Sequence, residues 1–459
     1  MQYRSEAVTL TATIQNQLFN KRLKRPLTFL DSAQRTSSSV RWSILAENPS
    51  HCFISSERAV LLDGAESMDD PIALLSKIHH FRSFKNLPPK FPWPGGIVAL
   101  SYDLKGMVED KLQATTQLPS GFPDIVAYFF DRWLCVDHQN HEAWVLGVNH
   151  DNDERFDEKF DDFRQRLLEP EIEEGDPFSV KPLSCFPSET VYKQSVQHLL
   201  EGINEGDYYQ ANLSRQYTMQ LQGDVRSLYT SLRRHSPNPF NAFMEFGSQS
   251  LLSASPEQFV KIDLAGELKS CPIKGTRPRS KNVKEDNHNY NHLLNSAKDK
   301  AELAMIVDLI RNDLGRFCEL GSVKVPQKRR IERYTGVHHT AAIIEARVSW
   351  PWQLDSFIKA MIPGGSITGA PKIAAIQELT KIEPKSRGFY SGNLLLLDAL
   401  GRMDSSILIR TLVANHKELS LQVGGGIVSD SQIDMELQET KDKAYSLLKA
   451  CGLKDKDFT

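Results

Sequence analysis

This sequence of 459 residues lacks any long hydrophobic run. Apolar stretches such as Leu394 to Leu397 are far shorter than the roughly 20 residues that a membrane-spanning helix needs. The first residues, Met1 to Glu6, contain no apolar segment of the kind that forms the centre of a signal peptide. We therefore predict a soluble, cytoplasmic protein that makes no membrane contact.

The sequence is also poor in cysteine and has little net charge. Its six cysteines show no Cys-x-x-Cys pair or metal-ligand spacing, which favours reduced thiols over a disulfide framework. The formal net charge of −3 gives no basic surface for nucleic acid or an anionic membrane. An anionic ligand must therefore meet locally placed cations, and the expected partner is a small molecule.

An acidic segment, residues 151–177, separates two parts of the chain. Within it Phe156, Phe160, Phe163 and Leu167 recur at helical spacing, which predicts an amphipathic helix with a solvated acidic face. A proline-containing stretch follows. We place a boundary there, between an N-terminal domain of residues 1–185 and a second domain of residues 186–459.

Strands and helices are both expected. Short β-forming runs at residues 96–100 and 144–148 suggest an antiparallel layer, and strict alternation over residues 209–221 predicts a long strand with one polar face. Further elements are expected as helices at 191–203, 289–316, 371–380 and 434–450 and as strands at 394–399, 405–414 and 419–424. The pattern indicates an α+β fold.

A lysine stands in an unusual setting in the segment Pro272-Ile273-Lys274-Gly275-Thr276, here called the lysine segment. Proline restricts one backbone dihedral and glycine permits close ligand approach, which predicts a short rigid turn that aims the ammonium. Burial readily lowers the pKa of a lysine and makes it an amine nucleophile. The alternative interpretation is a solvated surface charge.

Acidic residues occupy two predicted helices. Glu302 lies beside an apolar stripe, while Glu436 and Glu439 share one helix face with Lys443. Carboxylates from two helices, without nearby Cys or His, suit Mg²⁺, which takes few protein oxygens plus water and substrate oxygens. The alternative is an exposed helix with an ordinary Glu–Lys pair.

Arg410 lies in a predicted strand that is apolar on both faces. An unpaired guanidinium there would be costly, so it requires either a bound carboxylate or an internal acid such as Asp398 or Asp404. Glu257, after Ser255-Pro256, and His339 are candidates for proton transfer, although a core or surface role is the commoner fate of histidine.

Two glycine clusters permit a ligand to approach the backbone. Gly364-Gly365-Ser366 leads to Pro371 at an expected helix start, where backbone N–H groups can face an anion. Gly424-Gly425-Gly426 ends a predicted strand. Such clusters more often form simple turns, so they carry weight only together with the other motifs.

Together these segments resemble the signature of the chorismate-utilising enzymes, most specifically over residues 190–450. The resemblance rests on residues 255–257, the lysine segment, Glu302 to Asp313, and segments 363–372, 409–412, 424–428 and 438–440. It implies two interleaved subdomains built on large antiparallel sheets, with the active site in the cleft between them.

The resemblance implies that the C4 hydroxyl of chorismate is replaced by an amine. Lys274 is expected to form a covalent intermediate with Glu257 as general acid, and Glu302, Glu439 and Glu436 are expected to hold Mg²⁺. A separate glutamine amidotransferase subunit is expected to supply ammonia, since no segment resembles one. The expected substrate contacts are Gly275, Thr276, His339, Ser366, Tyr390, Arg410, Gly424, Gly425, Gly426 and Lys443.

A second ligand site is expected from looser resemblance to segments that hold tryptophan in relatives. An amino acid needs acceptors for its ammonium and an apolar slot for its side chain. Trp42 narrows that slot, and ordinary packing between the domains is the alternative. The residues concerned are Ser32, Ser39, Val40, Arg41, Trp42, Pro239, Phe240 and Asn241.

Three alternatives remain for the activity. Anthranilate synthase component I shares every motif except the lysine, where that enzyme has alanine. Isochorismate and salicylate synthases use water and place a lysine base where this chain has Gln210. A non-catalytic homologue that binds only chorismate or tryptophan is disfavoured, because Glu257, Lys274, Glu302 and Glu439 are all intact.

Overall fold

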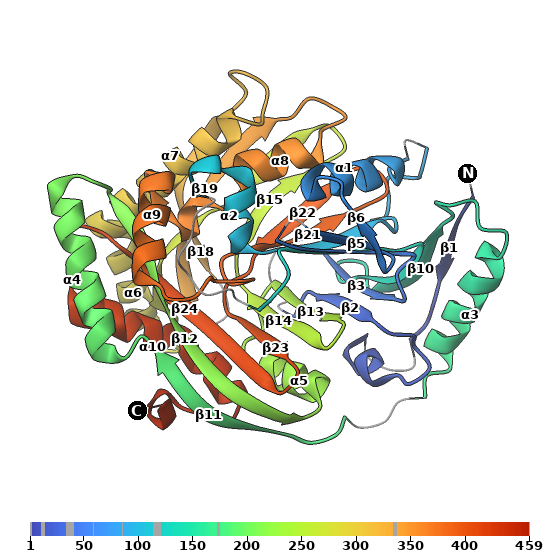
Figure 1. Ribbon diagram of the computed structural model, residues 1–459, viewed down its shortest axis with the longest axis horizontal. Helices are drawn as coiled ribbons and strands as arrows, with labels where there is room; N and C mark the ends of the chain where they lie inside the picture. The colour runs from blue at the N-terminus through green and yellow to red at the C-terminus, as the bar shows by residue number, and fades with distance from the viewer. Residues whose placement is uncertain are drawn as a thin grey trace.

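The computed structural model describes residues 2–10, 14–33, 41–57, 59–84, 86–112, 121–171, 175–333 and 337–458. Two large antiparallel sheets form its framework, and helices cover their outer faces (Figure 1). The predicted α+β class, built on large antiparallel sheets, is confirmed. None of the described helices has the length and apolar character that crossing a membrane requires.

The first sheet has the order β1-β10-β9-β3-β2-β13-β14-β23-β24-β12-β11, and β20 pairs with β12 beside this path. Its strands are β1 (Tyr3–Ala7), β2 (Leu27–Asp31), β3 (Trp42–Glu47), β9 (Arg132–Asp137), β10 (Glu142–Val148), β11 (Phe178–Phe186), β12 (Gln210–Gly223), β13 (Phe240–Phe246), β14 (Gln249–Ser255), β20 (Gly369–Ala370), β23 (Thr411–Asn415) and β24 (Glu418–Ile427).

The second sheet has the order β17-β19-β16-β15-β22-β21-β7-β8-β4-β5-β6, and β18 pairs with β19. Its strands are β4 (His51–Ser56), β5 (Ala59–Leu62), β6 (Ala65–Ser67), β7 (Gly96–Leu100), β8 (Ile125–Phe129), β15 (Gln258–Ile262), β16 (Glu267–Ser270), β17 (Ile273–Pro278), β18 (Lys324–Arg333), β19 (Val337–Arg347), β21 (Asn393–Leu397) and β22 (Met403–Ile407).

Both sheets combine strands from the two ends of the sequence. In the first sheet β13 pairs with β2, and in the second β21 pairs with β7. This is the interleaved arrangement that the resemblance implies. The division into residues 1–185 and 186–459 stays a prediction.

The helices follow the apolar periodicity of the sequence. They are α1 (Pro71–Phe81), α2 (Lys105–Val108), α3 (Phe156–Leu168), α4 (Glu189–Glu205), α5 (Val225–His235), α6 (Val283–Asn295), α7 (Ala297–Gly315), α8 (Leu354–Met361), α9 (Lys372–Ile382) and α10 (Ile433–Ala450), with 3-10 turns η1 (Ile14–Phe19), η2 (Tyr102–Leu104), η3 (Asp110–Leu112), η4 (Gly365–Ile367) and η5 (Asp455–Phe458). The acidic helix predicted from Phe156, Phe160, Phe163 and Leu167 is α3, and all four side chains are buried.

Three local predictions differ from the structure. The helix expected over 289–316 is broken at Ser296, whose hydroxyl accepts a hydrogen bond from the Asp299 N–H and begins a new helix. The strand expected over 405–414 is two strands, because Arg410 adopts a φ of 52° between them. Lys274 lies in strand β17 at an irregularity of its pairing with β19, not in a turn.

The hydrophobic core has separate parts: one on the outer face of each sheet, under the helices, and one between the two sheets. One cluster packs α3, α5 and α10 on the first sheet, and another packs α1, α7 and α8 on the second. A third cluster joins residues of both sheets, including Ile97, Trp133, Met244 and Leu394. Because the sheets share this inner core, the loops and strand ends at its edge have fixed positions.

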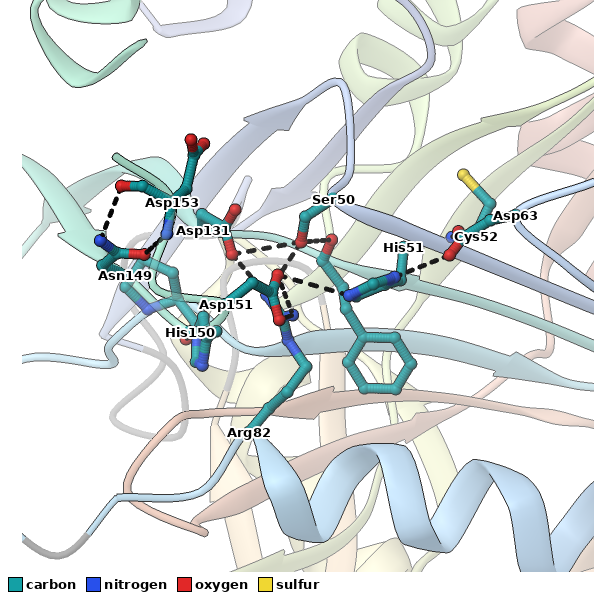
Figure 2. Close-up of polar contacts among 12 residues, drawn as sticks. Ser50, His51, Cys52, Asp63, Arg82, Asp131, Asn149, His150, Asp151 and Asp153 are labelled. Carbon is teal, nitrogen blue, oxygen red and sulfur yellow. Dashed lines mark hydrogen bonds and ion pairs between the residues drawn. The ribbon is translucent and has the colours of Figure 1, made fainter. Parts of the chain in front are cut away.

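The N-terminal half also contains a dense network of charges at the end of α1 (Figure 2). Arg82 donates to Ser50 Oγ at 2.8 Å and to Asp151 Oδ2 at 3.2 Å, and it forms an ion pair with Asp131. His51 lies 2.7 Å from Asp63 and 3.4 Å from Asp151. These contacts link α1 to three loops of the adjoining sheets.

Candidate active site

The lysine segment is held between β19 and α7. Lys274 stands opposite Thr340 in the β17–β19 pairing, and the Thr340 hydroxyl donates to the Lys274 carbonyl. Gly275 follows with a φ of 74°, and a Cβ there would lie 2.7 Å from Asp299 Oδ1. Only glycine fits this position, so the half-buried Lys274 side chain is directed by a backbone that α7 restrains.

Glu257 follows β14 and faces the positive groups of the site. Its N–H donates to Ser255 Oγ at 3.3 Å, and its carbonyl accepts from the Ile407 N–H at 3.2 Å. Burial raises the pKa of Glu257, while the charges of Lys274, Lys443 and Arg410 oppose that rise. A carboxyl group in such surroundings is suited to donating a proton.

Arg410 and His339 lie near these two groups. Burial lowers the pKa of Arg410, and Glu257 opposes that change. Burial, followed by the charge of Arg410, lowers the pKa of His339 to about 4, while its hydrogen bond to the Gly275 backbone opposes the shift. His339 is therefore a neutral imidazole at pH 7.

The internal acids that sequence analysis considered for Arg410 have other partners. Asp398 pairs with Arg402 at 2.6 Å, and Asp404 accepts a hydrogen bond from Gln258 at 2.8 Å. Among the described residues Arg410 forms no ion pair within 4.0 Å. This arrangement favours the other interpretation, in which Arg410 meets the carboxylate of a ligand.

Glu436 and Glu439 border the glycine cluster of β24. A Cβ at Gly425 would lie 3.2 Å from Glu436 Oε2 and 3.4 Å from Glu439 Oε1. Glu436 is buried and accepts from Ser431 Oγ at 2.7 Å, whereas the Glu439 side chain is 49% exposed and lies 2.6 Å from Lys443 Nζ. Lys443 lowers the pKa of Glu439, and Lys443 also donates to the Gly424 carbonyl at 2.7 Å.

Glu302 approaches this pair from α7. Its pKa is raised by burial and further by the charges of Asp299 and Glu439, while Lys274 and Lys298 oppose the rise. Among the described residues no group of three or more His, Cys, Asp or Glu side chains has a geometry that holds a metal by itself. The carboxylates nevertheless fit Mg²⁺, because repelling carboxylates from two helices, completed by water and ligand oxygens, form the set that this ion prefers.

The remaining predicted contacts surround Gly424. A Cβ at this glycine would lie 2.8 Å from Tyr390 Oη and 3.1 Å from Asn212 Oδ1. Ser366 is buried in η4, whose first residue Gly365 has no room for a side chain, since Leu309 would be 2.4 Å from its Cβ. The side chain of Thr276 lies outside the described residues. The structure thus brings together predicted site residues that are far apart in the chain, such as Glu257 and Lys443.

Several buried polar residues of this region were not predicted to belong to the site. Gln210 Nε2 and Asn212 Oδ1 are buried on β12 and have no hydrogen-bond partner among the described residues. Glu383 and Arg387 form a buried ion pair immediately before Tyr390. In the sequence this pair is visible as an acidic and a basic residue four positions apart, with Pro384 between them and outside any predicted helix.

A cavity of about 240 Å³, here called the tryptophan cavity, is lined by most of the residues predicted to hold tryptophan. Ser32 donates to the Trp42 carbonyl at 2.7 Å, and the Arg41 guanidinium lies 4.2 Å from the Trp42 ring. Arg41, Trp42, Pro239, Phe240 and Asn241 line the cavity with Ser32. Ser39 and Val40 lie outside the described residues, and tryptophan binding itself stays a prediction.

The chain is similar to several known proteins over most of its length. Over 387 residues the chain is 35% identical to "Aminodeoxychorismate synthase component 1" of Salmonella typhimurium, which covers 83% of this chain and 82% of that protein. It is 34% identical over 374 residues to "Anthranilate synthase component 1 1" of Haloarcula marismortui, covering 78% and 76%. The structure of anthranilate synthase component I from Streptococcus pneumoniae superposes with a TM-score of 0.78 at 28% identity, covering 90% and 93%.

A family model described as "chorismate binding enzyme" matches residues 30–449. The match includes both glycine clusters, the lysine segment, and all three candidate metal-binding glutamates. It also extends well into the N-terminal half, where the resemblance was faint. The chain therefore belongs to the family of chorismate binding enzymes.

Proposed function

We propose that this enzyme aminates chorismate at C4 to form 4-amino-4-deoxychorismate, the precursor of p-aminobenzoate in folate biosynthesis. The similarity to aminodeoxychorismate synthase component 1 over most of the chain supports the reaction. The observation that carries it is the position of Lys274, whose charge acts on both Glu257 and Glu302. An amine nucleophile beside a proton donor is what an addition and elimination on the chorismate ring requires.

The proposed reaction has two displacement steps. In the first, Lys274, once it has lost its proton, adds at C2, both double bonds of the ring shift, and the C4–O bond breaks. Glu257 donates a proton to the departing hydroxyl, which leaves as water. In the second, ammonia adds at C4, both double bonds shift back, and the bond between C2 and Lys274 breaks. The proton lost from the added ammonia returns to Glu257. The net exchange consumes ammonia and releases water.

The remaining residues would bind and orient the substrate. Arg410 is the cation for one substrate carboxylate, and Tyr390 with Gly424 would border the ring. Mg²⁺, held by Glu302 and Glu439 with support from Glu436, would supply positive charge for the ring carboxylate. His339 would stay neutral, donating its N–H to the Gly275 backbone.

Ammonia is proposed to come from a separate glutamine amidotransferase subunit. None of the six cysteines lies in a Gly-x-Cys-x-Gly sequence, the nucleophile turn of such an enzyme. The relatives named component 1 are in keeping with a second component. Purified chain should use ammonium salts but not glutamine, and product formed from glutamine by the pure chain would contradict this division.

Anthranilate synthase component I is the second candidate activity, favoured by the Haloarcula relative and the Streptococcus structure. One incubation separates the two: the protein with chorismate, Mg²⁺ and ammonium, followed by product identification. We expect 4-amino-4-deoxychorismate. Anthranilate with pyruvate would establish the second candidate, and isochorismate would mean that water is the nucleophile.

A further inference from the structure

Glu383 and Arg387 form a buried ion pair beside the candidate site, and both side chains make several further hydrogen bonds. Arg387 donates from Nε and Nη2 to the two carboxylate oxygens of Glu383, both at 2.8 Å. The side chains are only 1% and 6% exposed. A planar, two-point pair of this kind fixes orientation as well as distance, because guanidinium and carboxylate must be coplanar to make both bonds.

The guanidinium has further donors, and these hold two backbone segments of the site. Nη1 donates to the Ile367 carbonyl at 3.2 Å, in the glycine-rich turn that contains Ser366. Nη2 donates to the Asn212 carbonyl of β12 at 2.5 Å. One side chain thus sets the distance between the turn and the strand.

The carboxylate of the pair acts on a third segment. Glu383 Oε1 accepts from the Ser214 N–H at 3.2 Å and from Ser214 Oγ at 2.6 Å. Ser214 is the register partner of Gly424 in the β12–β24 pairing, and Gln422 of β24 donates to Ser214 Oγ at 2.7 Å. The pair is therefore connected to the strand that carries the glycine cluster.

Aromatic rings complete this arrangement. The Arg387 guanidinium lies 4.6 Å from the ring of Tyr102 and 5.7 Å from the ring of Tyr390, and the Tyr390 N–H donates to the Arg387 carbonyl at 3.2 Å. Tyr102 belongs to the N-terminal half, whereas Tyr390 is a candidate substrate contact. A cation between two rings restrains both of them.

We infer that the Glu383–Arg387 pair is a positioning pair, which holds Ser366, Tyr390 and Gly424 in the arrangement that binds chorismate. The inference rests on the proposed chorismate site. Tyr390 contacts Arg387 directly, Ser366 precedes Ile367, whose carbonyl Arg387 holds, and Gly424 pairs with Ser214, which Glu383 holds. The pair does not touch the reacting atoms. Its effect is on the affinity for chorismate, since small displacements of binding groups weaken a ligand strongly.

Two conservative variants test this inference. Arg387→Lys keeps the charge but loses the planar guanidinium that makes two parallel bonds to Glu383. Glu383→Gln keeps an acceptor for Ser214 but loses the charge. Each should weaken chorismate binding, measured by calorimetry with Mg²⁺ and without ammonium, by about tenfold or more. The KM for ammonium should not change. Unchanged chorismate affinity in Arg387→Lys would overturn the inference.

Arg82→Lys is the matched control, because Arg82 is a similarly buried guanidinium, 4% exposed, in the network of Figure 2. It should lower the melting temperature as the test variants do, yet leave chorismate affinity unchanged. Equal loss of affinity in Arg82→Lys would mean a general effect of stability and would also overturn the inference.

Ser214→Ala provides a test if the charged variants do not fold. It removes the hydroxyl bond to Glu383 but keeps the ion pair and the backbone bond. Chorismate affinity should fall about threefold or more, with little change in melting temperature; unchanged affinity counts against the pair. The affinity for chorismate tests this inference, whereas the identity of the product tests the proposed amination. Either of the two can therefore fail without the other.

Discussion

Two clusters of charge in this protein are built in opposite ways. In the network of Figure 2, Arg82 has hydrogen bonds or ion pairs to Ser50, Asp131 and Asp151. In the candidate active site, the charges of Lys274 and Arg410 act on the pKa of Glu257, but these three groups form no ion pairs within 4.0 Å among the described residues. Buried charge normally requires a partner.

From this difference we propose that the first cluster is structural and that the second binds a ligand. A charge that contacts its partners directly, as Arg82 contacts Asp131 and Asp151, holds segments of the chain together. Charges that face each other without direct contact leave room for a molecule whose own charged groups pair with them. Perturbed pKa values commonly mark such sites. The predictions below test this distinction by changing one group at a time in each cluster.

The largest effect is expected at the carboxylates. Glu302→Gln and Glu439→Gln keep volume but remove charge, and each should lower turnover about a hundredfold, because a metal ion contributes several kcal/mol to charge stabilisation. Steady-state rates over a Mg²⁺ titration measure the turnover and the metal dependence of each variant. Asp442→Asn, an exposed change on the same helix as Glu439, is the control. Unchanged turnover and metal dependence in either Gln variant would show that the metal assignment is wrong.

Lys274→Ala should reduce the rate with ammonium by a few tens of fold, on the order of 2 kcal/mol, because the covalent route is lost while direct substitution by ammonia remains. Intact-mass measurement should detect a chorismate-derived adduct on the wild-type chain and none on the variant. Lys269→Ala, at an exposed lysine in strand β16, which precedes β17 in the chain, should behave as wild type. Full activity of Lys274→Ala would contradict the proposal.

The pH dependence should separate Glu257 from His339. Burial raises the pKa of Glu257, so its acidic form persists to higher pH than usual, and kcat should fall as pH rises through that raised value. Glu257→Gln should lose this limb along with most of the activity. His339, with a pKa of about 4, should contribute no transition between pH 5 and 8. Kinetics from pH 5 to 9 on both proteins measure these limbs; the same limb in Glu257→Gln would assign it elsewhere.

The network of Figure 2 should respond in stability and not in chemistry. Arg82→Met leaves Asp131 without its cation, so the free energy of unfolding should fall by about 3–5 kcal/mol. The turnover of the folded fraction should stay at the wild-type value. Denaturant unfolding and rates at low temperature measure the two quantities. Loss of turnover at unchanged stability would remove the distinction between the clusters.

The smallest effect on turnover is expected at the tryptophan cavity, lined by Ser32 and Trp42. If tryptophan occupies it, calorimetry should show binding that weakens in Ser32→Ala, since Ser32 orders the cavity wall through the Trp42 carbonyl. Turnover should be unaffected, because we expect a structural and not an inhibitory ligand. Absence of heat and of thermal shift at millimolar L-tryptophan would rule the site out.

Local patterns predicted much of the fold. The apolar spacing of Phe156 to Leu167 is sufficient for α3, and the alternation over 209–221 is sufficient for β12, because each reflects one buried face. The burial of the polar side of β12 could not be predicted from this alternation. Asn212 and Ser214 are buried there, since Glu383 and Arg387 arrive from a distant segment.

The sequence by itself determined the kinds of residue available, namely a lysine beside glycine, three glutamates on two helices and two glycine clusters. It also determined the class of the fold, since helix and strand periodicities are local. Only the tertiary structure decided that Lys274 lies in a strand, that Arg410 interrupts one, and that the Glu383–Arg387 pair supports the site. These features depend on contacts between residues far apart in the chain, and such contacts leave no periodic trace in the sequence.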